Sequence, residues 1–353
     1  MTDAYPHRAV AIIGGGPAGL MLALSLQQRG CRDLAIIEPG LSKAQRLAES
    51  IPPPTAQTLG EWGVDLSQGG HLPCYGTVSE WGSPIQGYND YLAQPGGLGY
   101  WVDRTDLETQ LKQRYLEQGG NWLDASVESG QHHDRTVNAL QIRSAHGLSN
   151  LTADLVVDAS GSGVLLNQLG VAQNRIDGLI YHYQLYHRPD DLPQMGHIQA
   201  CDRGWWYCAP VSEQQILVAF VTDKQHRLKP TATLPPMPLL KRTLQPCTEL
   251  RSRQADLAIR SAVVGPNWLA VGDAACRFDP INAAGISKAI ATGHAGAEAI
   301  MAWRARPRAN ALRAYQQAIF ADFTHHVNLR QQLYHQIARI HPTPFWQRRC
   351  QPE

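Results

Sequence analysis

AVAIIGGGPAGLMLAL, residues 9–24, joins an apolar run of strand type to an almost wholly apolar helix through a glycine-rich turn. The glycines have the G-x-G-x-x-G spacing, in which residues without a Cβ allow a tight turn and bring the backbone close to a ligand. Backbone N–H groups at the start of such a helix bind a pyrophosphate. The residues predicted to form this site are Gly14, Gly16, Pro17, Ala18 and Gly19.

An acidic residue follows the next apolar run at the spacing typical of a dinucleotide site. The run Leu34–Ile37 ends at Glu38, nineteen residues after Gly19. A carboxylate there accepts hydrogen bonds from the ribose hydroxyls of adenosine and disfavours a 2′-phosphate. Strand, helix and acid together predict a dinucleotide rather than a glycine-rich turn without a ligand, and they leave NAD and FAD open.

The stretch WLAVGDAACRFDPINAAGISKAIATGHAGAEAI, residues 268–300, favours FAD. It resembles the second FAD fingerprint of flavoprotein hydroxylases of the p-hydroxybenzoate hydroxylase fold, although another βα unit would explain its apolar pattern. The resemblance implies that Asp273, after Gly272, holds the ribityl chain. It also implies that the loop through Pro280 leads to a helix whose first N–H groups, at Gly285 and Ile286, face the pyrimidine side of the flavin, where they stabilise negative charge.

Further stretches agree with this family. LVVDASGSG, residues 155–163, is similar to the strand that closes the FAD domain. Arg104 precedes an expected capping box, Thr105-x-x-Glu108, and the matching arginine of the family faces the flavin. An arginine there could equally be a surface residue. The resemblance also implies a backbone contact of Val127 to the adenine and a flavin contact of Arg46.

These pieces predict an α/β, two-domain architecture. A discontinuous Rossmann-like FAD-binding domain would comprise residues 1–60, 101–175 and 262–305. An antiparallel-sheet substrate domain would comprise residues 61–100 and 176–261, because runs such as LIYHYQLY and QQILVAFVTD are of strand type. Residues 306–353 would form a C-terminal helical segment packed against the core.

Composition excludes several classes of partner. The 353 residues are 43% hydrophobic and 17% charged, with a formal net charge of +1, so we expect neither nucleic acid nor a membrane as partner. The seven cysteines are scattered without metal-ligand spacing, which predicts reduced thiols and no metal site. No apolar run approaches the roughly 20 residues that span a bilayer. We expect a cytoplasmic protein.

Three local signatures narrow the family. AESIPPPTAQTLGEWGV, GWWYCAPV and FWQRR, which begin at residues 48, 204 and 345, resemble flavoenzymes related to tryptophan halogenases. Within these they are similar to the maturation flavoproteins for the cysteine tryptophylquinone of oxidases and dehydrogenases. This resemblance implies an FAD-dependent monooxygenase that uses NADH, NADPH or a reductase and transfers one atom of molecular oxygen, through a flavin C4a-hydroperoxide, to an aromatic ring. The implied substrate is a peptidyl tryptophan in a quinoprotein precursor.

The sequence departs from the pattern of these relatives in three places. It lacks the Trp-x-Trp-x-Ile-Pro signature, and Lys43, the only lysine in the first hundred residues, lies too early to match the lysine that halogenases use. Asn282-Ala283-Ala284 replaces a Ser-Ser-Gln of many relatives. Halogenation or reduction of a small aromatic metabolite is one alternative, and a non-catalytic FAD-containing escort of a partner enzyme is another.

The substrate side is predicted from residue type alone. His71 is a candidate acid–base group and Tyr75 a cleft residue, both within GGHLPCYGTVSEWGS. Trp205, Trp206 and Tyr207 lie on an expected strand as nominated contacts for an aromatic substrate, and the candidate singled out among them is Trp206. Aromatic side chains in strands also form cores, so the core interpretation stays open for this residue.

Overall fold

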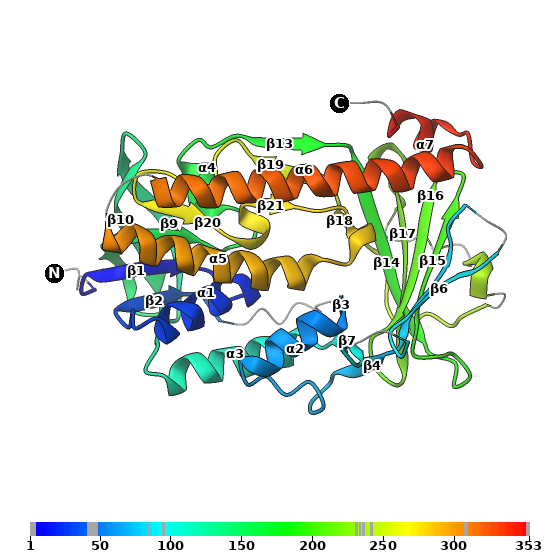
Figure 1. The fold of residues 1–353 in the computed structure, drawn as a ribbon, viewed down its shortest axis with the longest axis horizontal. Coiled ribbons are helices and arrows are strands. Elements are labelled where there is room, and N and C mark those ends of the chain that lie inside the picture. The colour runs from blue at the N-terminus through cyan, green and yellow to red at the C-terminus, as the bar shows by residue number, and fades with distance from the viewer. Residues whose placement is uncertain are drawn as a thin grey trace.

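A five-stranded parallel sheet joins four strands from the first 158 residues to the strand that opens the second fingerprint (Figure 1). The computed structural model describes residues 5–40, 49–82, 85–93, 96–229, 243–306 and 310–350, together with residues 232, 234 and 237–240. The sheet has the order β20 (Trp268–Ala270), β12 (Ala153–Asp158), β1 (Arg8–Ile13), β2 (Leu34–Ile37) and β8 (Asn121–Leu123). Strand β2 is apolar and buried throughout, and β1 and β12 are buried from Ala9 and Leu155 onward, as expected of parallel strands covered on both faces.

The helix after the glycine turn, α1 (Pro17–Gln28), packs against α5 (Gly285–Ala305) at very short range. A Cβ built on Gly293 would lie 2.6 Å from the Ala18 carbonyl oxygen, and one on Gly296 would lie 3.0 Å from a Leu22 methyl group. The small residues of α5 therefore serve helix packing. They bring the N-terminal ends of both helices to one place.

Smaller sheets and helices surround this core. The three-stranded sheets are β11 (Gly147–Leu151), β10 (Thr136–Ser144) and β9 (Ala125–His133); β13 (Gln173–Ile176), β19 (Leu257–Arg260) and β21 (Cys276–Arg277); and β3 (Glu49–Ile51), β7 (Gly99–Val102) and β4 (Leu72–Cys74). The shorter helices are α2 (Pro53–Glu61), α3 (Arg104–Glu117) and α4 (Val164–Gln168), with 3₁₀ turns at Lys224–His226, Pro238–Leu240, Gly272–Ala274 and Pro280–Asn282.

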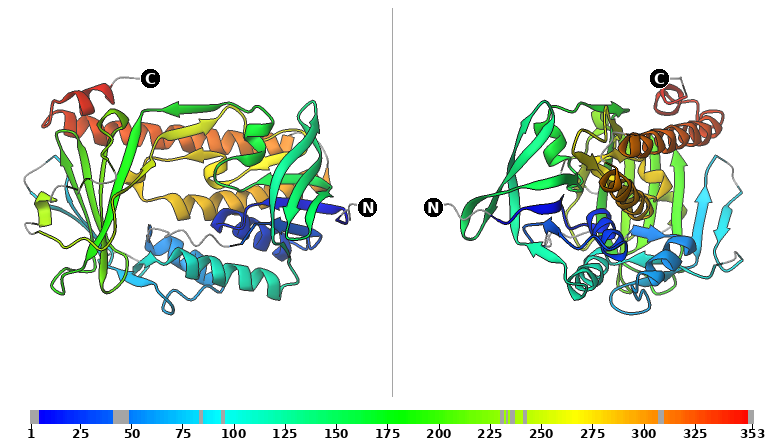
Figure 2. Two further views of the ribbon diagram at one scale, coloured as in Figure 1. Left: turned by 180° about the vertical axis from the view of Figure 1, so that it is seen from behind. Right: turned by 60° about the vertical axis from the view of Figure 1, so that its left-hand side comes forward.

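A seven-stranded sheet stands at the other end of the molecule (Figure 2). Its order is β18 (Arg251–Gln254), β14 (Leu179–His187), β17 (Gln215–Asp223), β16 (Gly204–Pro210), β15 (Gly196–Cys201), β5 (Gly76–Glu80) and β6 (Gly87–Asp90). All neighbours run antiparallel except β5 and β15, which are parallel. The predicted sheet is therefore present but mixed, because β5 joins its edge from a distant part of the sequence.

The long helix α6 (Asn310–Ala338) runs from the parallel sheet to the seven-stranded sheet, where α7 (Pro344–Arg348) follows it (Figures 1 and 2). Its first turns bury Leu312, Ile319 and Phe323 in the large core, and its last turns bury Tyr334 and Ile337 against the seven-stranded sheet. One continuous helix thus packs against both ends of the molecule.

The predicted fold class is confirmed: the chain is α/β, with a Rossmann-like parallel sheet, a separate largely antiparallel sheet and C-terminal helices. The predicted domain boundaries stay a prediction. All seven cysteines are free thiols. Among the described residues, no helix combines the length and apolar character needed to cross a membrane.

The expected capping box at Thr105 is wrong. Helix α3 begins two residues earlier, at Arg104, and Asp103 is its N-cap, accepting hydrogen bonds from the Thr105 and Asp106 N–H groups. Glu108, the expected partner of the box, is fully buried and accepts from Arg104 Nε at 3.0 Å instead. The Asp103 carboxylate, immediately before the first helical residue, takes the free N–H groups in place of the threonine.

Candidate functional site

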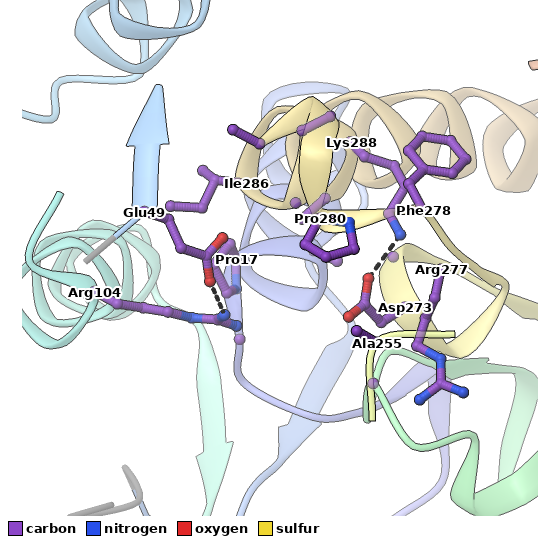
Figure 3. A pocket seen from close by; sticks show the side chains of 18 of the residues that line it. Pro17, Glu49, Arg104, Ala255, Asp273, Arg277, Phe278, Pro280, Ile286 and Lys288 are labelled. Atoms are coloured by element: carbon purple, nitrogen blue, oxygen red, sulfur yellow. Dashed lines mark hydrogen bonds and ion pairs between the residues drawn. The ribbon is translucent and has the colours of Figure 1, made fainter. Parts of the chain in front are cut away.

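A cavity of about 690 Å³ lies between the N-terminal ends of α1 and α5 and the seven-stranded sheet. Figure 3 shows part of its lining, including Pro17, Asp273 and Ile286. Most of the predicted cofactor residues line it: Gly14, Gly16, Pro17, Ala18, Glu38, Arg104, Gly272, Asp273, Pro280, Gly285 and Ile286. Residues from three distant parts of the sequence therefore meet in one space.

The three glycines of the turn have different roles. Gly14 has φ +108°, and a Cβ there would lie 2.5 Å from the Ala159 carbonyl oxygen. A Cβ on Gly19 would lie 2.1 Å from the Gly14 carbonyl oxygen, so this glycine allows helix and strand to pack. A Cβ on Gly16 would have only Arg104 Nη2 and Glu108 Oε1 nearby, at 3.8 and 3.9 Å. Gly16 is thus the glycine that keeps space free for a ligand.

Glu38 holds the turn from the next strand. Its Oε2 accepts a hydrogen bond from the Gly15 N–H at 2.9 Å while the residue lines the cavity. Gly15 is also required for packing, because a Cβ there would lie 2.2 Å from the Trp122 ring. Val127, in β9, lies outside the cavity lining, as does Gly19. Arg46 and Lys43 lie outside the described residues.

Asp273 is paired with a buried lysine that sequence analysis did not single out. Lys288 Nζ donates to Asp273 Oδ1 at 2.6 Å and to the Cys276 carbonyl oxygen at 2.5 Å, and its side chain is 3% exposed (Figure 3). Burial opposes ionisation of Asp273, but the Lys288 ammonium, with Arg104 and Arg277, holds the pKa of this carboxyl below its usual value. Asp273 is therefore a fixed anion with one face on the cavity.

The thiol next to this pair is not a nucleophile. Burial raises the pKa of Cys276 to about 11, so the side chain is a neutral, apolar group at physiological pH.

Arg104 bridges two carboxylates beside the start of α5. Its Nη1 donates to Glu49 Oε1 and its Nε to Glu108 Oε1, each at 3.0 Å (Figure 3). A Cβ on Gly285 would lie 2.9 Å from Glu49 Oε2, so the Glu49 carboxylate lies directly against the N-terminus of α5. Neither α1 nor α5 has a side-chain cap or an acidic residue in its first turn. Both helices thus direct positive ends without a cap of their own toward the cavity, and the Glu49 carboxylate lies against that of α5.

The loop before α5 is fixed from the opposite side by α6. Asp279 Oδ2 accepts from Arg330 Nε at 2.7 Å and from the Tyr334 hydroxyl at 2.8 Å, while its Oδ1 accepts from the Ile281 N–H. Arg330 also pairs with Asp177, which in turn pairs with Arg349. Pro280, the next residue, lines the cavity, so this buried network determines where the loop lies.

Aromatic side chains of the seven-stranded sheet form the opposite wall. In the register of the sheet, Tyr181, Val221 and Trp205 form one row across three strands. Tyr183, Ala219 and Tyr207 form the next row. Small central residues thus separate two pairs of large rings, which we call the aromatic rows. All four rings line the cavity, and burial raises the pKa of Tyr207 well above its usual value, so its hydroxyl is neutral.

Trp205 brings an unused hydrogen-bond donor to this wall. The side chain is 1% exposed, and its Nε1 has no hydrogen-bond partner among the described residues. An unpaired buried N–H costs roughly 1–3 kcal/mol. A ligand acceptor would remove this cost.

The structure does not bring His71, Tyr75 or Trp206 to the cavity. His71 is buried, and its Nδ1 accepts from the Asp103 N–H at the start of α3, while burial lowers its pKa. Tyr75 is 36% exposed in the turn before β5. Trp206 points to the other face of the sheet, where it stacks on Phe220 with ring centroids 4.5 Å apart.

Trp205 and Tyr207, named beside Trp206 on the same strand, do line the cavity. Several other cavity residues were missed by sequence analysis: Glu49, Tyr181, Tyr183, Arg253, Arg277 and Lys288. The alternation Tyr181-x-Tyr183 and Trp205-x-Tyr207 was a signal for the aromatic rows, because alternate residues of a strand share a face. Lys288 lies three residues after Gly285, one turn into α5, which was a signal that it faces the same side as that glycine.

The cavity fits FAD. The open space at Gly16, the two uncapped helix ends and the apolar ring wall are suited to a diphosphate, an anionic ring edge and an aromatic ring system respectively. No group of three His, Cys, Asp or Glu side chains among the described residues could hold a metal ion.

Comparison with known proteins gives one consistent family. The family model for tryptophan halogenase matches residues 83–353. LodB of Marinomonas mediterranea, which is described as an FAD-dependent oxidoreductase, is 26% identical over 356 residues, covering 96% of this chain and 95% of LodB.

Solved structures show the same fold. The flavin-dependent brominase Bmp2 has a TM-score of 0.81 at 21% identity, covering 95% of this chain and 88% of Bmp2. The peptidyl tryptophan dihydroxylase QhpG, essential for tryptophylquinone cofactor biogenesis, has a TM-score of 0.75 at 20% identity, covering 98% of this chain and 79% of QhpG.

Proposed function

Because the chain belongs to the tryptophan halogenase family, whose related enzymes depend on FAD, we propose that it is an FAD-dependent monooxygenase that hydroxylates an aromatic ring. The substrate we propose is a tryptophan side chain within a quinoprotein precursor. When bound, FAD would supply the redox chemistry that activates molecular oxygen. NADH or NADPH, or a separate reductase, would supply the electrons.

The residues of the turn and of α5 would hold the cofactor. The N–H groups at Gly16 and at the start of α1 would bind the diphosphate, and Glu38 the adenosine ribose. Asp273, held ionised by Lys288, would accept hydrogen bonds from the ribityl hydroxyls. The N-terminus of α5 at Gly285 would stabilise negative charge on the pyrimidine edge of the reduced ring.

The single observation that carries the proposed substrate class is the pair of aromatic rows in the same cavity as this cofactor site. The four rings line the cavity, and a planar indole in it would pack edge to face against them. The unpaired Trp205 N–H offers a donor to a backbone or side-chain carbonyl of the substrate. Exclusion of water by these rings would protect the oxygenating site.

Halogenation is a second candidate, favoured by the likeness to the brominase Bmp2. The lysine that lines the cavity, Lys288, has its ammonium group bound to Asp273 and to the Cys276 carbonyl oxygen. It is therefore engaged in holding the cofactor side of the cavity. This engagement favours oxygenation over halide chemistry for this chain.

The test is a mass measurement on the product. The purified protein, loaded with FAD, would be given NADH, a flavin reductase, ¹⁸O₂ and a tryptophan-containing precursor segment, with and without bromide. A mass gain from ¹⁸O that is independent of bromide is the expected result. Bromine in the product would establish halogenation instead. Flavin oxidation without any product would leave a reductase or an escort.

A further inference from the structure

The seven-stranded sheet ends in an exposed strand. β6 (Gly87–Asp90) pairs with β5 on one side, no other described strand pairs with it, and all four of its residues are exposed. Figure 1 shows β6 on the opposite side of this sheet from β18. An edge strand presents a row of backbone N–H and C=O groups that can pair with another chain.

The backbone groups on the open side of this strand belong to Tyr88 and Asp90. The Tyr91 N–H, directly after β6, donates to the Tyr75 carbonyl oxygen at 2.9 Å, so residue 91 directs its backbone toward β5. Backbone groups alternate along a strand, and those of residues 88 and 90 therefore point to the open side. Lysine and proline, which commonly protect such an edge, do not occur within β6.

Large apolar side chains gather along the same strand. Ile85, Tyr88 and Leu92 are 78%, 66% and 68% exposed, the three highest values among the exposed large hydrophobic residues described. We call these three residues, together with Asp90, the β6 edge. It combines open backbone groups with apolar side chains, and an added strand uses the first for affinity and the second for specificity.

The charge of this region distinguishes between possible occupants. Between Arg46 and Arg104 the sequence has six aspartates and glutamates and no lysine or arginine. Two of these acids, Glu80 and Asp90, lie in β5 and β6, and the neighbouring β15 contains no lysine or arginine. Pairing of two β6 edges would bring like charges together, which disfavours a second copy of this chain. A strand with basic side chains is complementary to this edge.

We propose that the β6 edge binds an extended, basic segment of the partner polypeptide that carries the target tryptophan, and that this segment pairs with β6 as an added strand. The inference rests on the proposed function for the identity of that partner, a quinoprotein precursor.

The position of β6 in the sheet gives the spacing between the bound segment and the target. β6 lies three strands from β16, the nearest strand of the aromatic rows, and neighbouring strands are about 4.8 Å apart, which makes about 14 Å. An extended chain covers this distance in about four or five residues. The target tryptophan would thus lie about that many residues beyond the bound segment.

Binding of defined peptides tests the β6 edge without any turnover. One probe is a short, fluorescently labelled peptide that alternates lysine with valine around a central tryptophan. A second has glutamate in place of lysine, and a third is the lysine peptide with methylated backbone nitrogens. Dissociation constants would be measured by fluorescence anisotropy on the full chain, for the wild type, Tyr88→Ser, Asp90→Asn and Leu148→Ser. Leu148 is the matched control, because it is an exposed apolar residue on β11, the edge strand of another sheet.

We expect the wild type to bind the lysine peptide about 10-fold more tightly than either of the other two peptides, because only the lysine peptide has both the charge and the backbone donors. Tyr88→Ser removes an exposed ring and should weaken the lysine peptide by about 5- to 20-fold. Asp90→Asn keeps an acceptor for the Leu92 N–H and removes the charge, so it should weaken this peptide by about 2- to 5-fold. Leu148→Ser should leave the constant unchanged.

Three results would overturn the proposal: no binding of the lysine peptide, equal binding of its methylated form, or an unchanged constant in Tyr88→Ser. A wild-type dimer that Tyr88→Ser converts to a monomer in sedimentation velocity would also overturn it, because the occupant would then be a second copy of this chain. The proposed function fails separately, if the wild type binds the lysine peptide as expected but oxygenates no tryptophan. The binding result stands in that case, because it involves no oxygen chemistry.

Discussion

The two halves of the cavity are built from different materials. The turn half, formed by residues 14–18, Asp273 and residues 285–288, presents backbone N–H groups, two helix ends and positions without a side chain. The sheet half, formed by the aromatic rows, presents large rings and hydroxyl groups. Backbone N–H groups and helix ends cannot be changed by substitution, so the turn half can bind only one kind of ligand. The rings of the sheet half can be exchanged for others of similar size without changing the backbone. The cofactor side is thus constrained by the backbone and the substrate side by side chains.

The largest expected effect comes from separating the two halves. Arg330 on α6 joins Asp177, beside the seven-stranded sheet, to Asp279 in the loop of the turn half, and all three are nearly inaccessible to solvent. Arg330→Met would leave two buried carboxylates without this partner. Removing one member of a buried ion pair costs about 3–5 kcal/mol, so denaturant unfolding should show a loss of that size. Arg143→Met, at an exposed pair, should cost less than about 1 kcal/mol.

The pH dependence of this loss identifies its cause. Burial opposes ionisation of Asp177, but Arg349 and Arg330 hold its pKa below the usual 3.8. The stability from the ionised group is therefore fully present above pH 3.8 and is lost as the pH falls through the lower pKa of the folded state. Without Arg330 that pKa rises, so the difference between wild type and variant should shrink below about pH 4. A constant difference across this range would point to packing instead of charge.

Much of the turn half could be predicted from the sequence, because few residue types fit its backbone conformation and its close contacts. A positive φ at Gly14 and a contact of 2.1 Å at Gly19 exclude any side chain, so the glycines are visible as a pattern. The resemblance to known flavoproteins then supplied Asp273 and Gly285. Lys288 escaped because one lysine in a helix carries no pattern until the cavity shows which side of α5 it faces.

The sheet half could not be predicted to the same depth. Alternation shows that Trp205 and Trp206 face opposite sides, but both faces of this sheet are covered, one by α6 and α7 and the other by residues such as Leu234 and Met237. Nothing in the local sequence tells which face meets the cofactor. Trp206 was chosen instead of its neighbour Trp205, and a shift of one residue along a strand moves a side chain to the other face. His71 and Tyr75 were chosen on residue type alone.

A pair of glycine variants tests whether the turn half is reserved for a ligand. Gly16→Ala adds a methyl group in open cavity space, and Gly19→Ala adds one against the Gly14 carbonyl oxygen. We expect Gly16→Ala to keep its thermal stability and to weaken FAD on the order of 100-fold, equivalent to about 2.7 kcal/mol. Gly19→Ala should lose about 1–3 kcal/mol of stability without any ligand present. Equal destabilisation of both variants would remove the distinction between a binding glycine and a packing glycine.

The smallest expected effect distinguishes the two faces of the sheet. Trp205→Phe removes the unpaired Nε1–H of a side chain that lines the cavity and keeps most of the ring area, whereas Trp206→Phe makes the same change on the face that stacks on Phe220. A neutral hydrogen bond contributes about 0.5–1.5 kcal/mol, so Trp205→Phe should reduce kcat/KM by about 2- to 10-fold. Most of that loss should appear as a higher KM if the N–H binds the substrate equally in ground and transition states. Trp206→Phe should leave both constants unchanged, because its ring does not reach the cavity. A larger loss of kcat/KM in Trp206→Phe than in Trp205→Phe would place the substrate on the face that carries Trp206. The aromatic rows would then have no part in the reaction.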